Sequence, residues 1–371
     1  MIKPMPTSTV IIAGLGAAGS AAAWRLAAAG HHVIALDRWP TPHTFGSTHG
    51  ETRVTRVTAW EGAHYVPLAQ RANALLDVLE RESGMPLRLH SGGLFVGFPH
   101  ETIIAGTLQC AEQAGVPCDV LTRDEVFARV HGIRVPEGMI GVVDPAAGVL
   151  LPEPILEAMH ASARRHGAEL RFDEPLVSWA PDGDGVVVTT TRGTLRADRL
   201  ILALGAWMPE VMASVGVTLT VERQTMHWFD ARRDAPPRPV LIVTDGNDHA
   251  TVIFPTRDGL VKAAGHGTQE FVDAETVDRT IHQRDIAPVA KLLDTWLPGD
   301  AGMHRRAATC LYTRTPSGHF ILDHHPQHPQ VVLASPCNGY GFKFAAAIGE
   351  GLAALVTGDE PEVPLTPWRL R

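Results

Sequence analysis

The sequence predicts an α/β (α+β) protein in which a parallel sheet with crossover helices is interleaved with a second, mostly antiparallel sheet. Three observations favour this class. A strand–helix–strand pattern occupies Ser8–Asp37, and a fully apolar run that ends in glycine recurs at Arg199–Gly205, as is typical of buried parallel strands. Short strand-like runs such as Val217–Phe229 and Leu260–Ala264 indicate the second sheet.

The first segment has the parts of a Rossmann-type dinucleotide site in the required order. The apolar strand Val10–Ile12 leads into a glycine-rich turn, a helix whose N-terminus attracts phosphates, and a second strand, Val33–Leu36. In the turn, Gly14 permits the tight bend, Gly16 lets backbone N–H groups approach a pyrophosphate, and Gly19 allows the helix to pack closely. The predicted phosphate-binding residues are Gly14, Gly16, Ala17, Ala18 and Gly19.

The second strand ends on an acidic residue, Asp37, which lies 18 positions after Gly19. An acid at this point binds ribose hydroxyls and disfavours a 2′-phosphate, so we do not expect NADP. This segment alone does not separate FAD from NAD. The alternative is a strand–helix–strand unit with a purely structural role.

Composition excludes several classes of protein. The length of 371 residues favours two domains. A net charge of −8 and the absence of a basic run make a nucleic-acid partner improbable. The four cysteines have no C-x-x-C spacing, which indicates a reducing compartment and argues against a disulfide scaffold or a metal site.

The chain lacks a continuous apolar stretch of about 18 residues, so we expect no membrane span. The apolar N-terminal stretch is interrupted by the glycine motif and by Trp24-Arg25. It is therefore interpreted as part of the fold rather than as an export signal. The expected location is the cytoplasm.

The first half of the chain continues with a polar, Pro- and Gly-rich loop at Arg38–Gly50, followed by elements that alternate between helical and extended patterns. We expect strands or extended segments at Thr52–Trp60, His90–Gly97 and Gly141–Leu151, and helices at Ala21–Ala28, Leu68–Arg81, Ile104–Gly115, Arg123–Val130 and Pro154–His166.

From Glu169 an antiparallel ladder is expected, with a hairpin turn at residues 181–185. The predicted strands are Leu170–Phe172, Leu176–Ala180, Val186–Thr191, Gly193–Ala197, Val240–Val243, Ala250–Phe254, Arg305–Thr313, Phe320–Asp323 and Val331–Ala334. Ala274–Leu297 is predicted to be mostly helical. A glycine turn at Pro336–Phe344 opens the helix Ala345–Thr357, and the Pro-rich tail after Gly358 is expected to lie on the surface.

Seven segments also carry a resemblance that is more specific than any one motif. They are Pro42–Arg56 (PHTFGSTHGETRVTR), Glu61–Leu68 (EGAHYVPL), Ser91–Leu94, Gly205–Trp207, Glu222–Gln224, Cys310–Thr313 and Asn338–Phe344. Together they resemble the monomeric sarcosine oxidase and N-methyltryptophan oxidase family of flavoprotein amine oxidases, nearly from end to end.

This resemblance implies FAD rather than NAD, and a two-domain fold like that of D-amino-acid oxidase. It implies hydride transfer from a secondary or N-methylated amino acid to flavin N5, giving an imine and, with O₂, hydrogen peroxide. The protein is expected to be a monomer. The FAD-binding domain would comprise residues 1–88, 144–215 and 318–371, and the substrate domain residues 89–143 and 216–317.

Three alternatives remain open from the sequence. One is a flavin-dependent amino-acid dehydrogenase of the same fold that uses an acceptor other than oxygen. The second is a dinucleotide-binding protein without catalytic activity. The third is an NAD-dependent amino-acid dehydrogenase, which a covalent-anchor cysteine would disfavour.

By resemblance, Cys310 is joined to the 8α-methyl group of the flavin as a thioether. Such chemistry needs a thiolate and favours nearby cations, and Arg305 and Arg306 are close in sequence. The alternative for Cys310 is a small buried apolar residue, with Cys337 as a rival anchor. The other predicted cofactor-binding residues are Arg38, Ser47, Thr48, Arg53, Val177, Gly205, Trp207, Gly339, Gly341, Phe342 and Lys343.

The resemblance assigns the substrate carboxylate to a cationic pair, Arg56 and Lys343, whose charge and geometry would fix it. Arg53 and Arg56 are three residues apart, so in an extended segment they point to opposite faces and have different roles. A surface salt bridge is the alternative for Arg56. Tyr340 is expected at the substrate, at a position that is commonly histidine in sarcosine oxidases.

Lys262 is the only cation in an apolar strand and matches the family's oxygen-activating lysine. A fixed positive charge there would stabilise superoxide, whereas a strand-edge lysine is the structural alternative. His266 matches a histidine near the substrate amine. Because Tyr340 and the Val252–Lys262 segment depart from the sarcosine oxidase pattern, we expect a substrate other than sarcosine itself.

Overall fold

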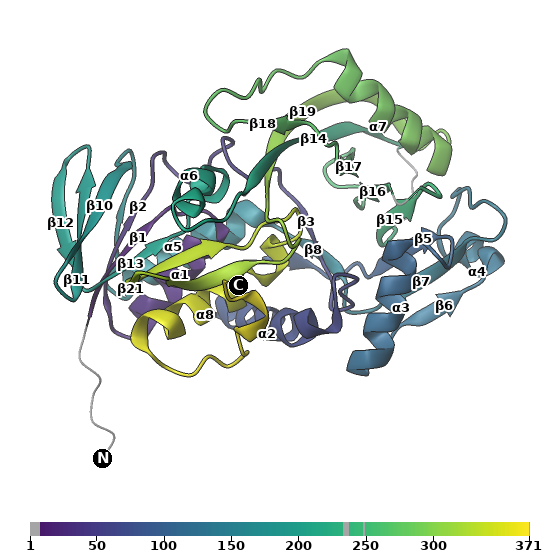
Figure 1. The fold of residues 1–371 in the computed structure, drawn as a ribbon. Coiled ribbons are helices and arrows are strands. Elements are labelled where there is room, and N and C mark those ends of the chain that lie inside the picture. Colours follow the sequence, from purple (N-terminus) through teal and green to yellow (C-terminus); the bar gives the residue numbers. More distant parts are fainter. Residues whose placement is uncertain (1–7, 233–236, 248, 371) are drawn as a thin grey trace.

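The computed structural model describes residues 8–232, 237–247 and 249–370, and its ribbon contains two sheet-based halves (Figure 1). The predicted domain segments include residues 1–7, 233–236, 248 and 371, which lie outside the described residues. The domain boundaries stay a prediction.

The first sheet contains the predicted parallel core. In spatial order its strands are β20 (Ile321–His325), β21 (His328–Ser335), β13 (Arg199–Leu202), β1 (Thr9–Ala13), β2 (His32–Leu36) and β9 (Glu169–Arg171). β1 pairs in parallel with both β2 and β13, so the chain returns to this sheet at Arg199, as predicted. β20 and β21 form an antiparallel hairpin at one edge.

Leu170–Phe172 was predicted as part of the antiparallel ladder, and this prediction is wrong. The strand there is β9, which pairs in parallel with β2. The preceding helix α5 (Pro152–Arg165) carries the chain back across the sheet as a crossover connection, which a parallel neighbour requires.

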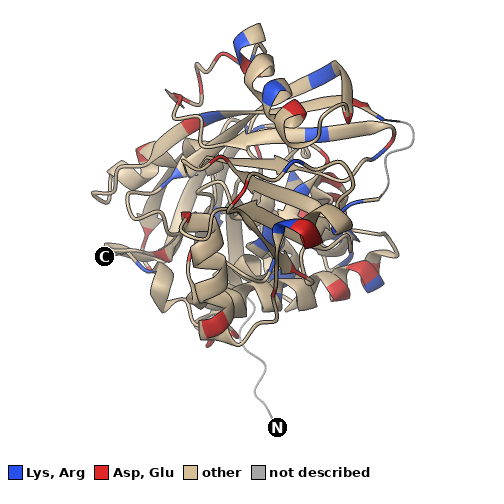
Figure 2. Cartoon of the chain, turned by 90° about the vertical axis from the view of Figure 1, so that its right-hand side faces the viewer, with Lys and Arg blue, Asp and Glu red and all other residues tan. Residues whose placement is uncertain are grey.

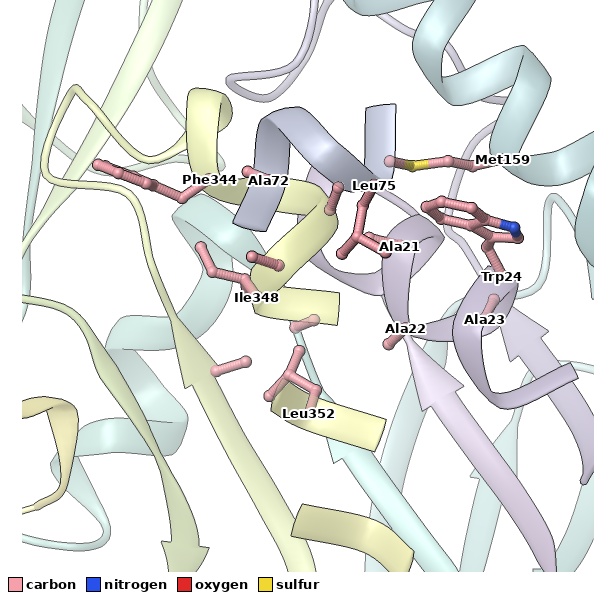
Figure 3. Close-up of a cluster of buried hydrophobic side chains, with 14 of the residues drawn as sticks. Ala21, Ala22, Ala23, Trp24, Ala72, Leu75, Met159, Phe344, Ile348 and Leu352 are labelled. Carbon is pink, nitrogen blue, oxygen red and sulfur yellow. The ribbon is translucent and has the colours of Figure 1, made fainter. Parts of the chain in front are cut away.

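Helices cover one face of this sheet. They are α1 (Ala17–Ala28), α2 (Val66–Ser83), α5 and α8 (Ala345–Thr357), and their apolar side chains form one cluster (Figure 3). α1 and α8 approach closely because both are rich in small residues. A Cβ placed on Gly349 would lie 2.4 Å from the backbone carbon of Ala21, so the close crossing requires glycine there.

The other face is covered by a three-stranded antiparallel sheet of β10 (Leu176–Asp182), β11 (Gly185–Thr190) and β12 (Gly193–Ala197), with helix α6 (Met208–Ala213). Val186 and Val188 point inward from β11 and pack with Ile11 of β1. The parallel strands are therefore buried on both sides, which explains their continuous apolar runs.

The second sheet is mostly antiparallel, as predicted. Its strands in order are β18 (Phe271–Val272), β14 (Thr220–Ala231), β17 (Leu260–His266), β16 (Ala250–Ile253), β15 (Val240–Thr244), β5 (Gly93–Gly97), β7 (Ile140–Asp144) and β6 (Asp119–Leu121), and β19 (Ala301–Arg314) also pairs with β14. The pair β15–β5 is parallel and joins strands from two distant parts of the chain.

Alternation along β17 decides which side chains reach the space between the two halves. Val261 and Ala263 pack against Val289 and Leu293 of helix α7 (Gln283–Trp296), which lies over the outer face of the sheet (Figure 1). Because successive strand residues face opposite ways, Lys262 and its even-numbered neighbours face inward, toward the first half.

The remaining elements connect these layers. They are the small antiparallel sheet β3 (Arg53–Thr55), β8 (Gly148–Leu150) and β4 (Arg88–Leu89), the helices α3 (Thr102–Ala114) and α4 (Arg123–Arg129), and the short 3₁₀ turns η1 (Ala63–Tyr65), η2 (Gly205–Trp207), η3 (Phe342–Phe344) and η4 (Thr366–Trp368).

Two predicted segments differ in the structure. The helix expected from Ala274 begins only at Gln283, because the Asp273 and Asp278 side chains accept backbone N–H groups in local turns that compete with a helix. The C-terminal tail was expected on the surface, but Trp368 is fully buried against the helices of the first half.

Basic and acidic residues are interspersed along the chain (Figure 2). Among the helices formed by the described residues, none combines the length and apolar character needed to cross a bilayer.

Candidate active site

A single cavity of about 1100 Å³ connects the glycine-rich turn of the first half with the inner face of the second sheet. Its wall includes every predicted site residue except Gly19. Those residues are Gly14, Gly16, Ala17, Ala18, Asp37, Arg38, Ser47, Thr48, Arg53, Arg56, Val177, Gly205, Trp207, Lys262, His266, Cys310, Gly339, Tyr340, Gly341, Phe342 and Lys343. The fold thus brings residues more than 300 positions apart into one space, although their roles stay predictions.

At one end of the cavity, backbone groups form a narrow cradle. Gly14 has φ +95°, and a Cβ on it would lie 2.4 Å from the carbonyl oxygen of Ala203. A Cβ on Gly19 would lie 1.8 Å from the oxygen of Gly14. Gly19 therefore permits the tight contact between turn and helix, and the first residues of α1, Ala17 and Ala18, line the cavity.

Asp37 links this turn to the end of β2. One carboxylate oxygen accepts the Leu15 N–H at 2.7 Å and the other accepts the Trp39 N–H at 3.0 Å. Burial raises the pKa of Asp37 despite these hydrogen bonds, and His43 lies 3.7 Å away. The carboxylate therefore stays beside the cavity in a position fixed by the backbone.

The cradle and its surroundings fit a dinucleotide cofactor. Besides the glycines, two buried polar atoms in this wall, Thr41 Oγ1 and Trp207 Nε1, have no hydrogen-bond partner among the described residues. Buried polar groups are rarely left unpaired, so both atoms favour a bound ligand with hydrogen-bonding groups. FAD would meet this need in a cavity of this volume.

Cys310 lies on the inner face of β19, where Arg53 Nη2 is 3.7 Å from its Sγ atom. Arg53 also donates to the carbonyl oxygen of Ser47 at 2.8 Å. Burial raises the pKa of the Cys310 thiol, while Arg53 and Lys262 act in the opposite direction. The charges beside this thiol thus come from other strands of the structure.

Arg305 and Arg306 are close to Cys310 in sequence, but the structure shows them in ion pairs elsewhere. Arg305 pairs with Asp230, and Arg306 pairs with Glu51 at 2.6 Å. Residues four apart on a strand are about 13 Å apart, which places Arg306 beyond contact with the thiol. Sequence proximity was therefore a poor guide to the electrostatics of this cysteine.

At the other end, Arg56 and Lys343 converge on one carboxylate. Arg56 Nη2 lies 2.5 Å from Glu61 Oε1, and Lys343 Nζ lies 3.8 Å from the same oxygen. All three side chains are buried, with exposed fractions of 2%, 4% and 7% for Arg56, Lys343 and Glu61. We call these three residues the clamp.

Electrostatics of the clamp follow from its burial. Burial opposes ionisation of Glu61, but Arg56 and Lys343 outweigh it and lower the pKa to about 2. The pKa of Lys343 falls well below its ordinary value because of burial and the nearby Arg56 charge. Two basic groups share one carboxylate, so the site has capacity for a further anion.

Lys262 occupies the inner face of β17, under the segment 50–52. Its Nζ donates to Gly50 O at 2.6 Å, Thr52 O at 2.9 Å and Thr52 Oγ1 at 3.0 Å. The same nitrogen lies 4.7 Å from the centroid of the Phe254 ring and 5.3 Å from that of the Trp228 ring. Burial and the Arg53 charge lower its pKa well below the ordinary value. Lys262 is therefore not the exposed strand-edge residue of the structural alternative.

His266 and Tyr340 line the wall nearer the clamp. His266 Nδ1 lies 3.3 Å from the hydroxyl of Tyr312, and burial lowers its pKa to about 4. The Tyr340 hydroxyl lies 3.0 Å from that of Tyr65 and donates to Gly318 O. Burial raises the pKa of Tyr340, so both side chains are neutral at pH 7.

Sequence reasoning missed three residues of this region. Glu61 belongs to a segment already recognised, but its contacts with Arg56 and Lys343 exist only in the folded chain. Gln224 lines the cavity with an Oε1 atom that has no hydrogen-bond partner in the described parts of the chain. His49 is buried next to the cavity-lining Thr48, and burial lowers its pKa to about 3.

Comparison with known proteins places the chain among flavoenzymes. A family model described as FAD dependent oxidoreductase matches residues 9–355. The chain is 36% identical to the monomeric sarcosine oxidase of Streptomyces avermitilis, with 94% of each chain covered. It is 30% identical to the N-methyl-L-tryptophan oxidase of Yersinia pestis (strain Pestoides F), with 95% of each covered.

A solved structure gives the same fold. NikD, described as an unusual amino acid oxidase essential for nikkomycin biosynthesis, superposes with a TM-score of 0.86 over 98% of both chains, at 22% identity. This likeness supports the interleaved arrangement of the two halves.

Proposed function

Because the chain belongs to the family of FAD-dependent oxidoreductases, we propose that it oxidises a secondary or N-methylated amino acid, with dioxygen as the electron acceptor. The observation that carries this proposal is the clamp, in which Arg56 and Lys343 share one buried carboxylate.

The clamp would bind the substrate through its carboxylate. Arg56 presents a planar fork that matches a carboxylate bidentately, and Lys343 adds a second charge. Arrival of another anion raises the pKa of Lys343 and repays part of its desolvation. The substrate is then fixed at one end, so its C–N bond has a defined position in the cavity.

FAD, when bound, supplies the electron acceptor for a hydride from the substrate C–H and returns the electrons to dioxygen as hydrogen peroxide. The substrate becomes an imine, which water hydrolyses. Residues at the glycine-rich turn, with Asp37, Thr48 and Trp207, would hold the dinucleotide. Cys310 would hold the flavin covalently as a thioether, an attachment whose two electrons dioxygen would take up, and Arg53 would favour the Cys310 thiolate.

The amine must lose its proton before oxidation, because an ammonium has no lone pair. His266 and Tyr340 carry no charge at neutral pH, so neither side chain would retain an ammonium ion. Glu61 is the nearby carboxylate, and its charge is engaged by Arg56. The surroundings therefore favour the neutral amine.

Lys262 would serve the oxygen half-reaction. Its three hydrogen bonds to Gly50 and Thr52 hold the nitrogen in place within an apolar surround. A positive charge at that point stabilises the superoxide anion that forms when dioxygen accepts its first electron.

The experiment that tests the proposal measures flavin bleaching without oxygen and peroxide formation with oxygen, using sarcosine and a panel of N-methyl and cyclic amino acids. We expect substrate-dependent bleaching and one peroxide per turnover. Bleaching without peroxide would instead support a dehydrogenase. Absence of bleaching with every amine would contradict an amine oxidase.

Two variants separate the roles of Lys262 and Cys310. Lys262→Met should keep anaerobic bleaching and slow reoxidation by oxygen at least 100-fold. Cys310→Ala should release the yellow colour into the supernatant after acid precipitation, whereas the unaltered protein keeps it in the pellet. Colour that still pellets in Cys310→Ala would assign the linkage to Cys337.

A further inference from the structure

We propose, on the basis of the proposed function, that the amino acid oxidised at this site has an uncharged, apolar side chain larger than that of glycine. The cavity wall beside the clamp contains a group of six apolar side chains, which we call the side-chain compartment. Its residues are Val54, Trp60, Ile242, Ala250, Val252 and Phe254.

The compartment is contiguous with the clamp through Trp60. The guanidinium carbon of Arg56 lies 3.3 Å from the centroid of the Trp60 ring. The backbone of α3 packs closely against Trp60. A Cβ placed on Gly106 of this helix would lie only 2.9 Å from the Trp60 carbonyl oxygen. A substrate whose carboxylate is bound by Arg56 therefore has this indole as its neighbour.

The second sheet supplies the rest of the compartment. Ala250 and Val252 occupy alternate positions of β16 and face the same side. Phe254 follows directly after this strand and lines the same cavity. Ile242 and Ala250 belong to one buried cluster, against which Val54, Trp60 and Val252 pack. Val54 and Val252 also pack against Phe254. The six side chains thus form one continuous apolar surface.

Size and polarity of these residues define the substrate. Two of them, Ala250 and Val252, are small, so the strand β16 leaves space where larger side chains would fill it. Carboxylate, ammonium, hydroxyl and amide groups are absent from the six side chains. The indole N–H of Trp60 is the one polar group of these side chains, and the nearby Lys262 already donates to Gly50 and Thr52. A charged substrate group in this compartment would therefore lose more hydrogen bonds to water than it regains, which costs free energy.

An apolar side chain gains binding energy by the same argument. One methylene group in an apolar pocket changes the specificity constant by about 10- to 200-fold. Sarcosine carries only a hydrogen at its α-carbon and cannot use the compartment. We therefore expect a kcat/KM for N-methyl-leucine at least about 10-fold above that for sarcosine, and above that for N-methyl-aspartate by more than about 100-fold.

The experiment measures kcat/KM of the holoenzyme for sarcosine, N-methyl-leucine and N-methyl-aspartate, with both enantiomers of the last two. Leucine and aspartate side chains have similar shapes, so their comparison isolates charge. Efficiency with sarcosine equal to or above that with N-methyl-leucine overturns this inference and leaves the proposed function intact. Oxidation of none of the amines overturns the proposed function and this inference together.

Variants locate the effect in the compartment. Val252→Phe should fill it, lowering kcat/KM for N-methyl-leucine at least 10-fold while sarcosine changes less than 3-fold. Val252→Thr keeps the shape and replaces one methyl group with a hydroxyl. It should lower kcat/KM for N-methyl-leucine 3- to 10-fold. This variant keeps the test valid if Val252→Phe prevents folding. Ile253→Val, on the opposite face of β16, is the matched control and should leave the ratio unchanged. Equal effects of all three variants on the two substrates would contradict the assignment.

Discussion

The two ends of the cavity are built in different ways. The glycine-rich end comes from one continuous segment, and backbone groups of the turn and of the start of α1 form its wall. The clamp end is assembled from side chains on η3 and on the loop between β3 and η1, which are close only in the folded chain. The electrostatics of the clamp end come from buried, fully charged side chains. Those of the glycine-rich end come from the partial charges of the backbone.

This difference has an energetic consequence. The backbone cradle adds little to the free-energy cost of folding. Its N–H groups are the ones that the start of any helix leaves without an intrahelical partner. A buried ion pair costs several kcal/mol in desolvation and is stable only while every charge keeps its partner. Variants of the clamp should therefore affect stability and activity together, and variants of the cradle should act mainly through packing.

The largest effect is expected for Arg56→Met. It leaves Glu61 as a buried charge whose remaining basic neighbour, Lys343, is 3.8 Å away, and loss of one partner of a buried pair costs about 3–5 kcal/mol. Chemical denaturation should show this loss in the free energy of unfolding, and kcat/KM should fall by about 10³-fold or more.

Arg71→Met is the matched control for this variant, because Arg71 forms an ion pair with Glu350 but is 31% exposed. Its expected cost is about 0–1 kcal/mol. The double variant Arg56→Met with Glu61→Gln should recover stability without activity. Equal costs for Arg56→Met and Arg71→Met would contradict the buried-pair interpretation of the clamp.

A smaller effect is expected at the cradle from Gly19→Ala. The added Cβ would lie 1.8 Å from the Gly14 oxygen, so the turn must move, at a cost of about 1–3 kcal/mol. Flavin content of the purified protein should fall in parallel. Gly30→Asn tests a glycine with nothing within 4 Å of its Cβ position and a positive φ that asparagine tolerates. Loss of flavin in that control would point to general destabilisation instead.

The smallest effect concerns pH and involves His266, which lines the cavity wall nearer the clamp. Burial lowers the pKa of His266 from 6.5 to about 4. The unfolded chain therefore binds more protons between these values, and stability falls as pH falls from 6.5 through about 4. His266→Gln should reduce this slope in unfolding experiments, whereas His90→Gln, at an exposed position, should not. An unchanged slope in His266→Gln would contradict the stated pKa.

Local signals predicted the cradle well. Gly14, Gly19 and Asp37 occupy the expected places because strand, turn and helix are set by neighbours in sequence. Lys262 was identified as the only cation of an apolar strand, and it is buried on the inner face of β17. A single charge within an apolar strand is therefore a useful sign of a side chain that faces a cavity.

Interactions between distant segments were predicted less well. Arg53 reaches Cys310 from a separate sheet, so sequence proximity favoured Arg305 and Arg306 wrongly. Glu61 belongs to the clamp because of tertiary contacts, which no local sequence pattern predicts. The run from Ala274 to Ile281 has helix-forming residues, but side-chain hydrogen bonds from its aspartates compete with a helix.

The most direct test of the clamp compares anaerobic flavin bleaching by an N-methyl amino acid with that by its methyl ester, in the unaltered protein and in Lys343→Met. If Arg56 and Lys343 bind the carboxylate, the acid should bleach the flavin at least about 100-fold faster than the ester at low concentration. This preference should fall by about 10-fold or more in Lys343→Met, which removes one of the two cations and keeps Arg56. Equal rates for acid and ester in the unaltered protein would show that the two cations do not select the substrate.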